Sequence, residues 1–496
     1  MNAELRAASG VWAQRRGART TGDLLYAVYL TLLTVLVLLV PALRAGGAVL
    51  ARPDVLPLLQ HPHAPVGLAM ALGIAAAVLV LLGGTRGPAL LSPFLTETLA
   101  SSAIPRRRVL RRPYLRAIVL PALCCVLAAA LAGATLLQVG SLGMPLALLA
   151  GLAALGFGLL LGVCWLAGQL LTGPARVLLA LVLVALGAGV ALGIRAVPSL
   201  PLLPASVVAL GLGALSTVAS LPLLDRLRGR VLRQQALRWQ SATMSAETGD
   251  LAGAAVAYRP PPAVGRRLPA VGRGGLLLAY ARRDAVAWLR SPARSLGGLG
   301  LAVIGTALLV AAILLELGLP SWLLAGMGCL LLWWGSGTVV DGLRHAIHTL
   351  GSPPLFGQGL GAQLLLHLPA PALLILTVTG GSALAVSLLL GAGAFSAAVL
   401  VPMLLAPLLL LGRVWDAAKP PMPLSLTMPM PTPQGDASVL AMLIWQADAP
   451  LLHLGIGLVL VLLATAVAPL AAVVGALLAL TLLAVLALGR LRALRR

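Results

Sequence analysis

Apolar runs of membrane-spanning length recur along the whole chain, and they restrict its fold more than any other feature. A transmembrane helix needs about 20 predominantly apolar residues, and the 496-residue sequence holds twelve such runs. They are predicted at 24–43, 65–84, 117–139, 145–169, 175–194, 200–224, 296–317, 322–340, 362–388, 393–412, 450–467 and 470–488. With 60% hydrophobic and 10% charged residues, a soluble globular fold is excluded. We expect an all-α polytopic membrane protein.

The net charge of +22 is distributed between the apolar runs. If the N-terminus is cytoplasmic, 32 of the 35 basic residues fall in cytoplasmic segments, leaving only Arg44, Arg52 and Arg195 outside. Because cytoplasmic loops of membrane proteins are enriched in Lys and Arg, we predict that both termini are cytoplasmic. The charge is thereby explained by topology, and no nucleic-acid partner is expected.

The order of the parts repeats, which predicts two membrane halves at 1–224 and 276–496. Each half has a basic amphipathic segment, two spans, a cytoplasmic segment of about 20–30 residues and four more spans, as an internal duplication produces. The segment 225–275 between them contains Tyr258-Arg259-Pro260-Pro261-Pro262. Consecutive prolines exclude a helix there, so we interpret 225–275 as a cytoplasmic linker.

A surface helix is predicted at 276–294, ahead of the seventh span. One face of it carries apolar residues including Trp288, and the other carries Arg283, Arg290 and Arg294. This amphipathic pattern predicts a helix lying along the membrane with Trp288 at headgroup level. Residues Glu4 to Arg19 form the corresponding segment of the first half.

No phosphate-binding loop is present in the sequence. Such a loop, Gly-x-x-x-x-Gly-Lys-Ser/Thr, requires a lysine, and the single lysine, Lys419, lies between Ala418 and Pro420. If ATP drives this protein, a separate chain must hydrolyse it.

Three groups of residues resemble a known family. They are Leu91-Ser92-Pro93 leading into Ser101-Ser102-Ala103-Ile104-Pro105-Arg106-Arg107 and Leu110-Arg111-Arg112; Ala281-Arg282-Arg283-Asp284 with Leu289-Arg290-Ser291-Pro292; and Gly342-Leu343-Arg344. In these residues and in topology the chain resembles the permease subunit of ABC-2-type exporters, specifically the large twelve-span permeases of GC-rich bacteria.

The resemblance implies a transport subunit without catalytic residues in the bacterial cytoplasmic membrane. Segments 85–116 and 341–361 would be coupling segments, each meeting one of two ABC ATPase subunits, which would bind the ATP and Mg; this chain would hold no cofactor. One or two permease chains per complex are both allowed. The docking residues implied are Leu95, Glu97, Arg106, Arg107, Asp341 and Arg344. An ordinary positive-inside loop is the alternative for 85–116, and Arg106 to Arg108 suit anionic lipid headgroups equally.

Ionisable residues within spans are few. Charged groups there are costly and mark function, and the candidates for an intramembrane polar site are Glu316 and His367, although Glu316 lies near the outer end of its span. This scarcity favours a cavity of apolar and small residues, and therefore a lipophilic, amphipathic or peptide cargo.

The remaining chemistry-bearing residues predict no metal site. Asp341, His345 and His348 share a helical face compatible with metal ligation, but a solvated surface helix is the simpler interpretation. The histidines His61 and His63 have no third ligand nearby. Four cysteines, Cys124, Cys125, Cys164 and Cys329, lie in apolar runs as small core residues.

Two other protein classes compete with the exporter. A secondary carrier of major-facilitator type also has twelve spans, but its Gly-x-x-x-Asp-x-x-Gly-Arg-like turn belongs between spans two and three, whereas the nearest string here, Asp225 to Arg230, follows span six. A membrane-embedded lipid-modifying enzyme needs clustered acids, histidines or metal ligands, and the acids here are scattered.

Overall fold

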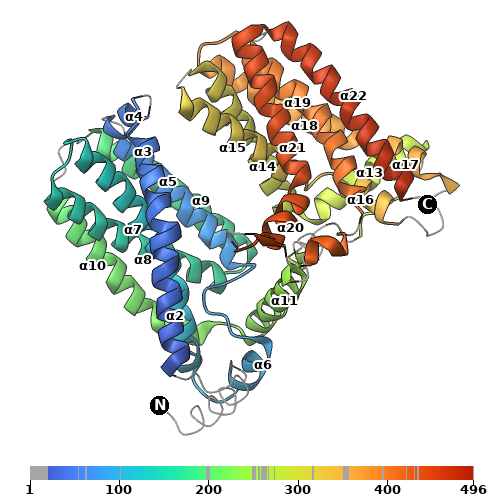
Figure 1. The fold of residues 1–496 in the computed structure, drawn as a ribbon. Coiled ribbons are helices and arrows are strands. Elements are labelled where there is room, and N and C mark those ends of the chain that lie inside the picture. Colours follow the sequence, from blue (N-terminus) through green and yellow to red (C-terminus); the bar gives the residue numbers. More distant parts are fainter. Residues whose placement is uncertain are drawn as a thin grey trace. The chain divides into compact units, whose positions relative to one another are not determined.

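The structure is a computed structural model that describes residues 21–494, except 54, 62–63, 101, 197–201, 248–252, 255–256, 259–264, 266, 273, 316–317, 350–356, 394–395, 421, 429 and 433–434. The chain forms two compact units, Met1–Leu237 (unit 1) and Arg238–Arg496 (unit 2). Their division falls inside helix α11, Gly229–Glu247. Both units consist mainly of helices (Figure 1).

Unit 1 contains α2 (Thr21–Thr34), η1 (Val35–Leu39), α3 (Val40–Leu50), α4 (Leu56–Gln60), α5 (Ala64–Gly83), α6 (Pro93–Leu95), η2 (Thr96–Ala100), α7 (Arg106–Gln138), α8 (Met144–Leu170), α9 (Gly173–Ala196), α10 (Leu202–Ser220), η3 (Leu221–Arg226) and the start of α11. Unit 2 contains α13 (Leu276–Arg290), α14 (Pro292–Leu314), α15 (Leu319–Ser336), α16 (Asp341–His348), α17 (Leu360–His367), α18 (Pro369–Leu389), α19 (Ala397–Ala417), η5 (Leu424–Thr427), α20 (Ser438–Gln446), α21 (Asp448–Leu462), η6 (Leu463–Val467) and α22 (Pro469–Ala493). A short antiparallel pair, β1 (Pro431–Thr432) and β2 (Gly435–Asp436), is the only strand pairing among the described residues.

Eleven helices of the described chain are long and apolar enough to cross a membrane. They coincide with eleven of the twelve predicted runs and confirm the all-α polytopic class. The first predicted run, 24–43, is helical but divided into α2, the π-helical turn η1 and α3, and its apolar helix is only Val28–Val37. Pro41 explains the division, because proline has no amide hydrogen to continue the α-helical pattern and the turn before it widens. A twelfth crossing stays a prediction.

Small residues determine how closely the helices of unit 1 approach. A Cβ atom added to Gly73 of α5 would lie 2.9 Å from Cα of Gly187 in α9, and one added to Gly156 of α8 would lie 2.3 Å from the carbonyl oxygen of Ala209 in α10. Inside a membrane the hydrophobic effect does not bring helices together, so close backbone contact is a main source of attraction. Larger side chains at these glycines would separate the pairs.

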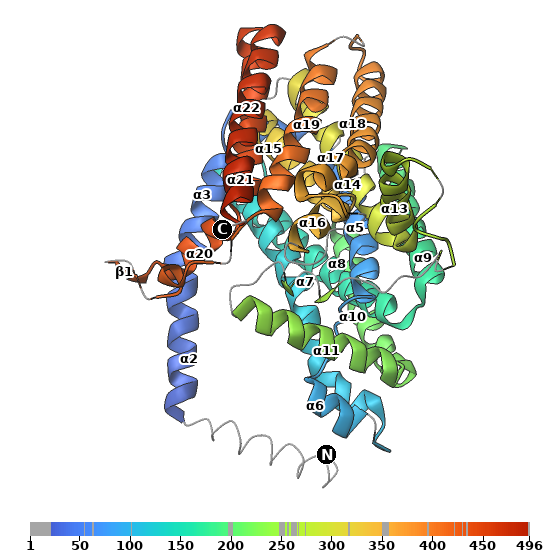
Figure 2. The same cartoon turned by 90° about the vertical axis from the view of Figure 1, so that its right-hand side faces the viewer.

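Unit 2 is built around α19, the most buried of its spanning helices. Val401, Leu405 and Leu408 of α19 have almost no exposed surface and belong to a core shared with α14, α15, α21 and α22. Figure 2 shows α18, α19 and α22 side by side. The same glycine contact recurs between α14 and α15, where a Cβ on Gly305 would lie 2.7 Å from the carbonyl oxygen of Gly328.

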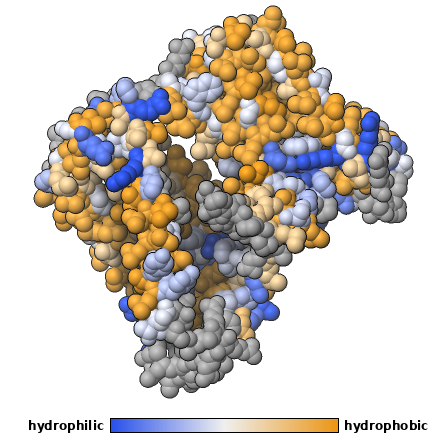
Figure 3. Space-filling model, in the orientation of Figure 1, coloured by the Kyte–Doolittle hydropathy of each residue, from blue (hydrophilic) through white to orange (hydrophobic). Residues whose placement is uncertain are grey.

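The face seen in Figure 3 is largely hydrophobic over both units. On α10, for example, Leu203, Val207 and Leu215 are each more than half exposed. Exposed apolar area on this scale is not stable in water, whereas it suits a hydrocarbon environment. The molecule is therefore a multi-pass membrane protein.

Candidate functional site: the polar ends of the two units

The first predicted coupling segment is folded onto the polar end of unit 1. It begins after α5, forms the short turns α6 and η2, and enters α7 at Arg106. Glu97 in η2 forms an ion pair with Arg233 of α11, and both side chains are about half exposed. Leu95 is half-buried, while Phe94 beside it is 57% exposed. The segment therefore presents an aromatic side chain on a turn that is anchored to the unit.

Arg106 and Arg107 connect the start of α7 to the residues after α10. Arg106 donates to the carbonyl oxygens of Ala100, at 3.2 Å, and of Leu227. The backbone N–H of Arg107 donates to Asp225 Oδ1 at 2.7 Å, and its side chain pairs with Asp225 Oδ2 at 3.4 Å. Asp225 thus caps the N-terminus of α7, where a carboxylate is favoured by the free amides and by the helix dipole.

Two buried glutamines, which the sequence analysis did not single out, fix the loop after α5. Gln169 of α8 donates to Gln235 of α11 at 2.9 Å, and Gln235 donates to the carbonyl oxygen of Gly83 at 2.9 Å. The amide of Gln169 also exchanges two hydrogen bonds with the backbone of Ala89. Both side chains are 2% exposed, and a buried amide is stable only when it is hydrogen-bonded. We refer to Gln169 and Gln235 as the amide clamp.

In unit 2, Asp341 is joined to the start of α14. Arg294 pairs with Asp341, with one contact at 3.1 Å from Nη2 to Oδ1, and Nη2 also donates to the carbonyl oxygen of Gly337 at 3.1 Å. Asp341 is the first residue of α16. The predicted docking residue Asp341 therefore holds α16 against α14 and α15.

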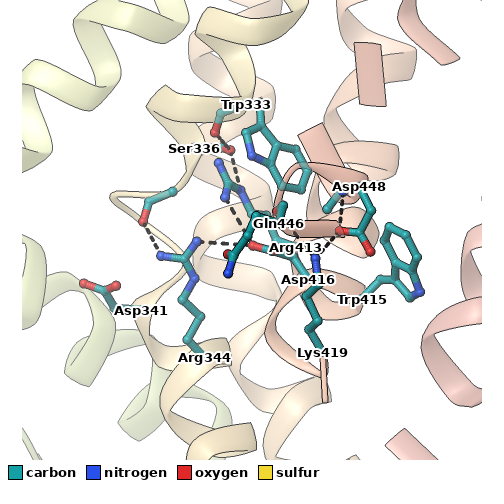
Figure 4. Close-up of polar contacts among 12 residues, drawn as sticks. Trp333, Ser336, Asp341, Arg344, Arg413, Trp415, Asp416, Lys419, Gln446 and Asp448 are labelled. Carbon is teal, nitrogen blue, oxygen red and sulfur yellow. Dashed lines mark hydrogen bonds and ion pairs between the residues drawn. The ribbon is translucent and has the colours of Figure 1, made fainter. Parts of the chain in front are cut away.

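Arg344, the other docking residue predicted in unit 2, belongs to a three-residue charge cluster. Asp416 Oδ2 lies 3.6 Å from Arg344 Nη2 and 3.7 Å from Arg413 Nη1. Arg413 also donates from Nε to Ser336 Oγ at 3.2 Å, and its guanidinium covers the ring of Trp333. Figure 4 shows Arg344 and Arg413 converging on Asp416. We call Arg344, Asp416 and Arg413 the first triad.

A second triad consists of Lys419, Asp448 and Arg490. Asp448 accepts from Lys419 at 2.6 Å and from Arg490 at 2.7 Å. Lys419 also donates to the carbonyl oxygens of Trp445 and Gln446, and Arg490 donates to that of Trp415 at 3.0 Å. The second triad joins the ends of α19, α20 and α22 to the start of α21.

His367, one of the two predicted intramembrane polar residues, lies in a buried pair. Its Nδ1 is 2.8 Å from Asp284 Oδ2, and the two side chains are 0% and 4% exposed. Tyr280 of α13 meets the imidazole ring edge-on. A Cβ on Gly342 would lie 2.4 Å from His367 Nδ1, so only glycine lets α16 approach the pair. The other predicted residue, Glu316, lies outside the described residues.

The predicted surface segment is helical over α13, and its Trp288 contacts the rest of unit 2. The indole Nε1 of Trp288 donates to the carbonyl oxygen of Val339 at 3.1 Å and its ring packs on the core of unit 2. The depth of Trp288 relative to the lipid headgroups stays a prediction. Arg290 donates to the carbonyl oxygen of Leu268 at 3.0 Å, while Arg283 is half-buried.

The histidines of α16 form no metal site with their neighbours. Among the described residues, no group of three His, Cys, Asp or Glu side chains could hold a metal ion. Of the two N-terminal histidines, His63 lies outside those residues. Partial burial lowers the pKa of His345, and Coulombic interactions with Arg283, His367 and His348 lower it further.

Comparison with other proteins identifies no relative: no family model, curated protein or solved structure matches the chain. Function must therefore be argued from the geometry of the two polar ends. Each end gathers the termini of several spanning helices into a network of side-chain contacts. Such a network can pass a displacement of one surface segment to several spans at once.

Proposed function

We propose that the chain is the membrane-spanning permease subunit of an ATP-driven exporter of ABC-2 type. It would move a lipophilic or amphipathic cargo outward, using ATP that is hydrolysed by a separate ATPase subunit, in two copies. The observation that carries this proposal is the anchored turn at the polar end of unit 1.

The anchoring makes segment 85–116 suited to passing force into the membrane helices. Arg106 and Arg107 tie the start of α7 to residues 225–227, and the amide clamp ties the end of α5 to α8 and α11. A partner that pushes on α6 would therefore move α5, α7 and α8 together. An unanchored loop would absorb the same displacement.

Unit 2 supports the proposal less directly, because the ion pairs of its docking residues are only 22–27% exposed, against 37–63% in unit 1. Asp341 pairs with Arg294, and Arg344 pairs with Asp416. We therefore infer unequal docking, in which an ATPase makes its stronger contact with unit 1. The exposed side chains of α6 and η2 are those of Phe94, Glu97 and Thr98.

Photo-crosslinking in the native membrane tests this proposal. A photoreactive amino acid replaces Phe94, and a matched control carries it at Met144, which is 60% exposed at the opposite end of α8. We expect position 94, and not position 144, to crosslink to a chain that contains a phosphate-binding loop. Crosslinks from position 94 to lipid alone would contradict the docking assignment.

A charge swap separates docking from folding. Glu97→Arg alone breaks the pair with Arg233, whereas Glu97→Arg combined with Arg233→Glu restores it with reversed polarity. If Glu97 contacts the ATPase, crosslinking from position 94 stays low in the double variant although the ion pair is restored. Full recovery in the double variant would limit Glu97 to a structural role.

A further inference from the structure

The guanidinium of Arg413 makes few hydrogen bonds within the described part of the chain. The side chain is 4% exposed and donates one hydrogen bond, from Nε to Ser336 Oγ. A guanidinium has five N–H groups, and its nearest carboxylate, that of Asp416, lies at 3.7 Å, beyond hydrogen-bond distance. Among the described residues, Nη1 and Nη2 of Arg413 therefore have no hydrogen-bond acceptor.

The first triad also carries more positive than negative charge. Two guanidinium groups, those of Arg344 and Arg413, share the single carboxylate of Asp416. This leaves one uncompensated positive charge near the ends of apolar helices, where an unpaired charge is costly. An anion would remove that cost.

A second group that lacks a hydrogen-bond partner lies beside the indole of Trp333. His453 of α21 is 4% exposed, and its Nε2 has no hydrogen-bond partner. Its ring centre is 5.6 Å from that of Trp333, and the same indole lies 3.8 Å below the guanidinium carbon of Arg413. Buried polar atoms in folded proteins are rarely left unpaired, so an unpaired imidazole nitrogen beside an under-coordinated guanidinium indicates a binding site.

The second triad has the same ratio of two cations to one carboxylate, but its cations find further hydrogen-bond acceptors. Lys419 and Arg490 also share one carboxylate, and Arg490 also covers a tryptophan, Trp415, at 3.7 Å. There, however, backbone carbonyl oxygens accept hydrogen bonds from both cations in addition to the carboxylate. Backbone contacts close the second triad, whereas Arg344 of the first has one 3.5 Å contact, to Gly337.

We propose that Arg344, Arg413 and His453 bind an oxyanion, a phosphate or carboxylate, which is the headgroup of an amphipathic molecule. Both groups accept several hydrogen bonds from guanidinium donors, and His453 donates from Nε2 in the tautomer that carries the proton there. Asp416 and Arg344 are about one quarter exposed, so the site opens to the surface of unit 2. Identifying the amphipath as the cargo rests on the proposed function; the binding itself does not.

Binding is measured on the purified full-length chain in dodecyl maltoside, a detergent without phosphate or carboxylate, and without any ATPase. Dodecyl phosphate is the probe, dodecyltrimethylammonium is the control of opposite charge, and tryptophan fluorescence is the signal. We expect saturable binding of dodecyl phosphate alone. Arg413→Met should weaken it at least tenfold, since a hydrogen-bonded charge pair is lost. Arg490→Met is the matched control in the second triad, and its affinity should equal that of the unaltered chain.

The direction in which Asp416→Asn changes the affinity for dodecyl phosphate is the decisive test of the proposal. Removing this carboxylate raises the net charge of the first triad, so dodecyl phosphate should bind several times more tightly. If Asp416 only supports the fold, the same substitution weakens binding or leaves it unchanged, and either result overturns the proposal. Equal affinity in Arg413→Met and the unaltered chain would overturn it as well.

Native mass spectrometry of the chain taken from its own membrane identifies the source of the headgroup. An anionic phospholipid retained by the unaltered chain and lost in Arg413→Met assigns the site to membrane lipid. Dodecyl phosphate binding without any retained phospholipid assigns it to an added amphipath, as expected for cargo. Both outcomes support an oxyanion site. Failure to find an ATPase would refute the proposed function and leave this measurement unaffected.

Discussion

The charged side chains at the polar end of unit 1 are more exposed than those at the polar end of unit 2. Among the described residues of unit 1, the ion pairs Arg107–Asp225 and Arg233–Glu97 have side chains that are 37–63% exposed. Those of the two triads in unit 2 are 4–25% exposed. Surface pairs contribute little to stability, and buried pairs are costly to break. Charge in unit 1 is thus available to a partner, and charge in unit 2 holds helices together.

Breaking the second triad should have the largest effect on stability. Asp448→Ala leaves Lys419 and Arg490 without their carboxylate, and removing one partner of a buried pair costs about 3–5 kcal/mol. We expect a large loss in the free energy of unfolding of the full chain in detergent. Asp225→Ala in unit 1 is the comparison and should cost about 1 kcal/mol, the value of a capping residue. Equal losses would remove the distinction between the units.

Replacing a glycine at a helix–helix contact, in contrast, should lower the free energy of unfolding by a similar amount in both units. Gly305→Leu in unit 2 and Gly73→Leu in unit 1 each place a side chain against neighbouring backbone. We expect each to cost about 1–3 kcal/mol or more. Gly300→Leu is the control, because a Cβ there meets nothing within 4 Å. Unchanged thermal stability of Gly305→Leu would show that the α14–α15 contact is looser than described.

The amide clamp should contribute more to unit 1 than its surface ion pairs do. Gln235→Leu removes the hydrogen bonds to Gly83 and Gln169 and leaves buried groups unsatisfied, which costs about 1–3 kcal/mol. Gln169→Leu should cost a similar amount. The double variant should lose less than the sum, since both changes remove one shared contact. Strict additivity in thermal unfolding would contradict the coupling.

The exposed pair of Glu97 and Arg233 should matter little for folding. Glu97→Gln is expected to change the free energy of unfolding by less than about 1 kcal/mol, and the difference should vanish in 1 M salt. The same substitution should reduce recovery of an ATPase partner. A stability loss as large as that of Asp448→Ala would show that this pair supports the fold.

Acid should weaken unit 2 slightly through His345. Its pKa is lower in the folded chain than the usual value of about 6.5, so the unfolded chain binds the proton more readily. Stability from this residue is complete above about pH 6.5 and is lost as the pH falls below it. His345→Gln should flatten the dependence of melting temperature on pH between about 7.5 and 5. An unchanged slope would assign the acid sensitivity to another group.

The sequence predicted the helices better than their contacts. The run predicted at 65–84 is α5 at 64–83, because apolar composition alone defines such a helix. Helix α7 begins at Arg106 instead of near 117, since hydropathy detects only the part of a helix that lies in hydrocarbon and arginines continue a helix into water.

The sequence could not predict which polar side chains contact each other, and the reason is physical. Alternation of spans predicts that Arg294, Asp341 and Arg413 lie at one end of unit 2, and their contacts there agree with it. Periodicity does not reveal which of them meet. Gln169 and Gln235 are 66 residues apart, and only packing of α8 against its neighbours brings them together. A polar residue near the end of an apolar run, such as Gln169 or Arg413, was the available signal.

Purification of the tagged chain from its native membrane in mild detergent, followed by mass spectrometry and an ATPase assay, tests the central claim most directly. The exporter account predicts an ATPase that copurifies in fixed ratio, with two ATPase copies, and ATP hydrolysis in the purified sample. A chain that purifies alone, without ATPase activity, and transports an amphipathic compound by itself would contradict the account and favour a secondary carrier.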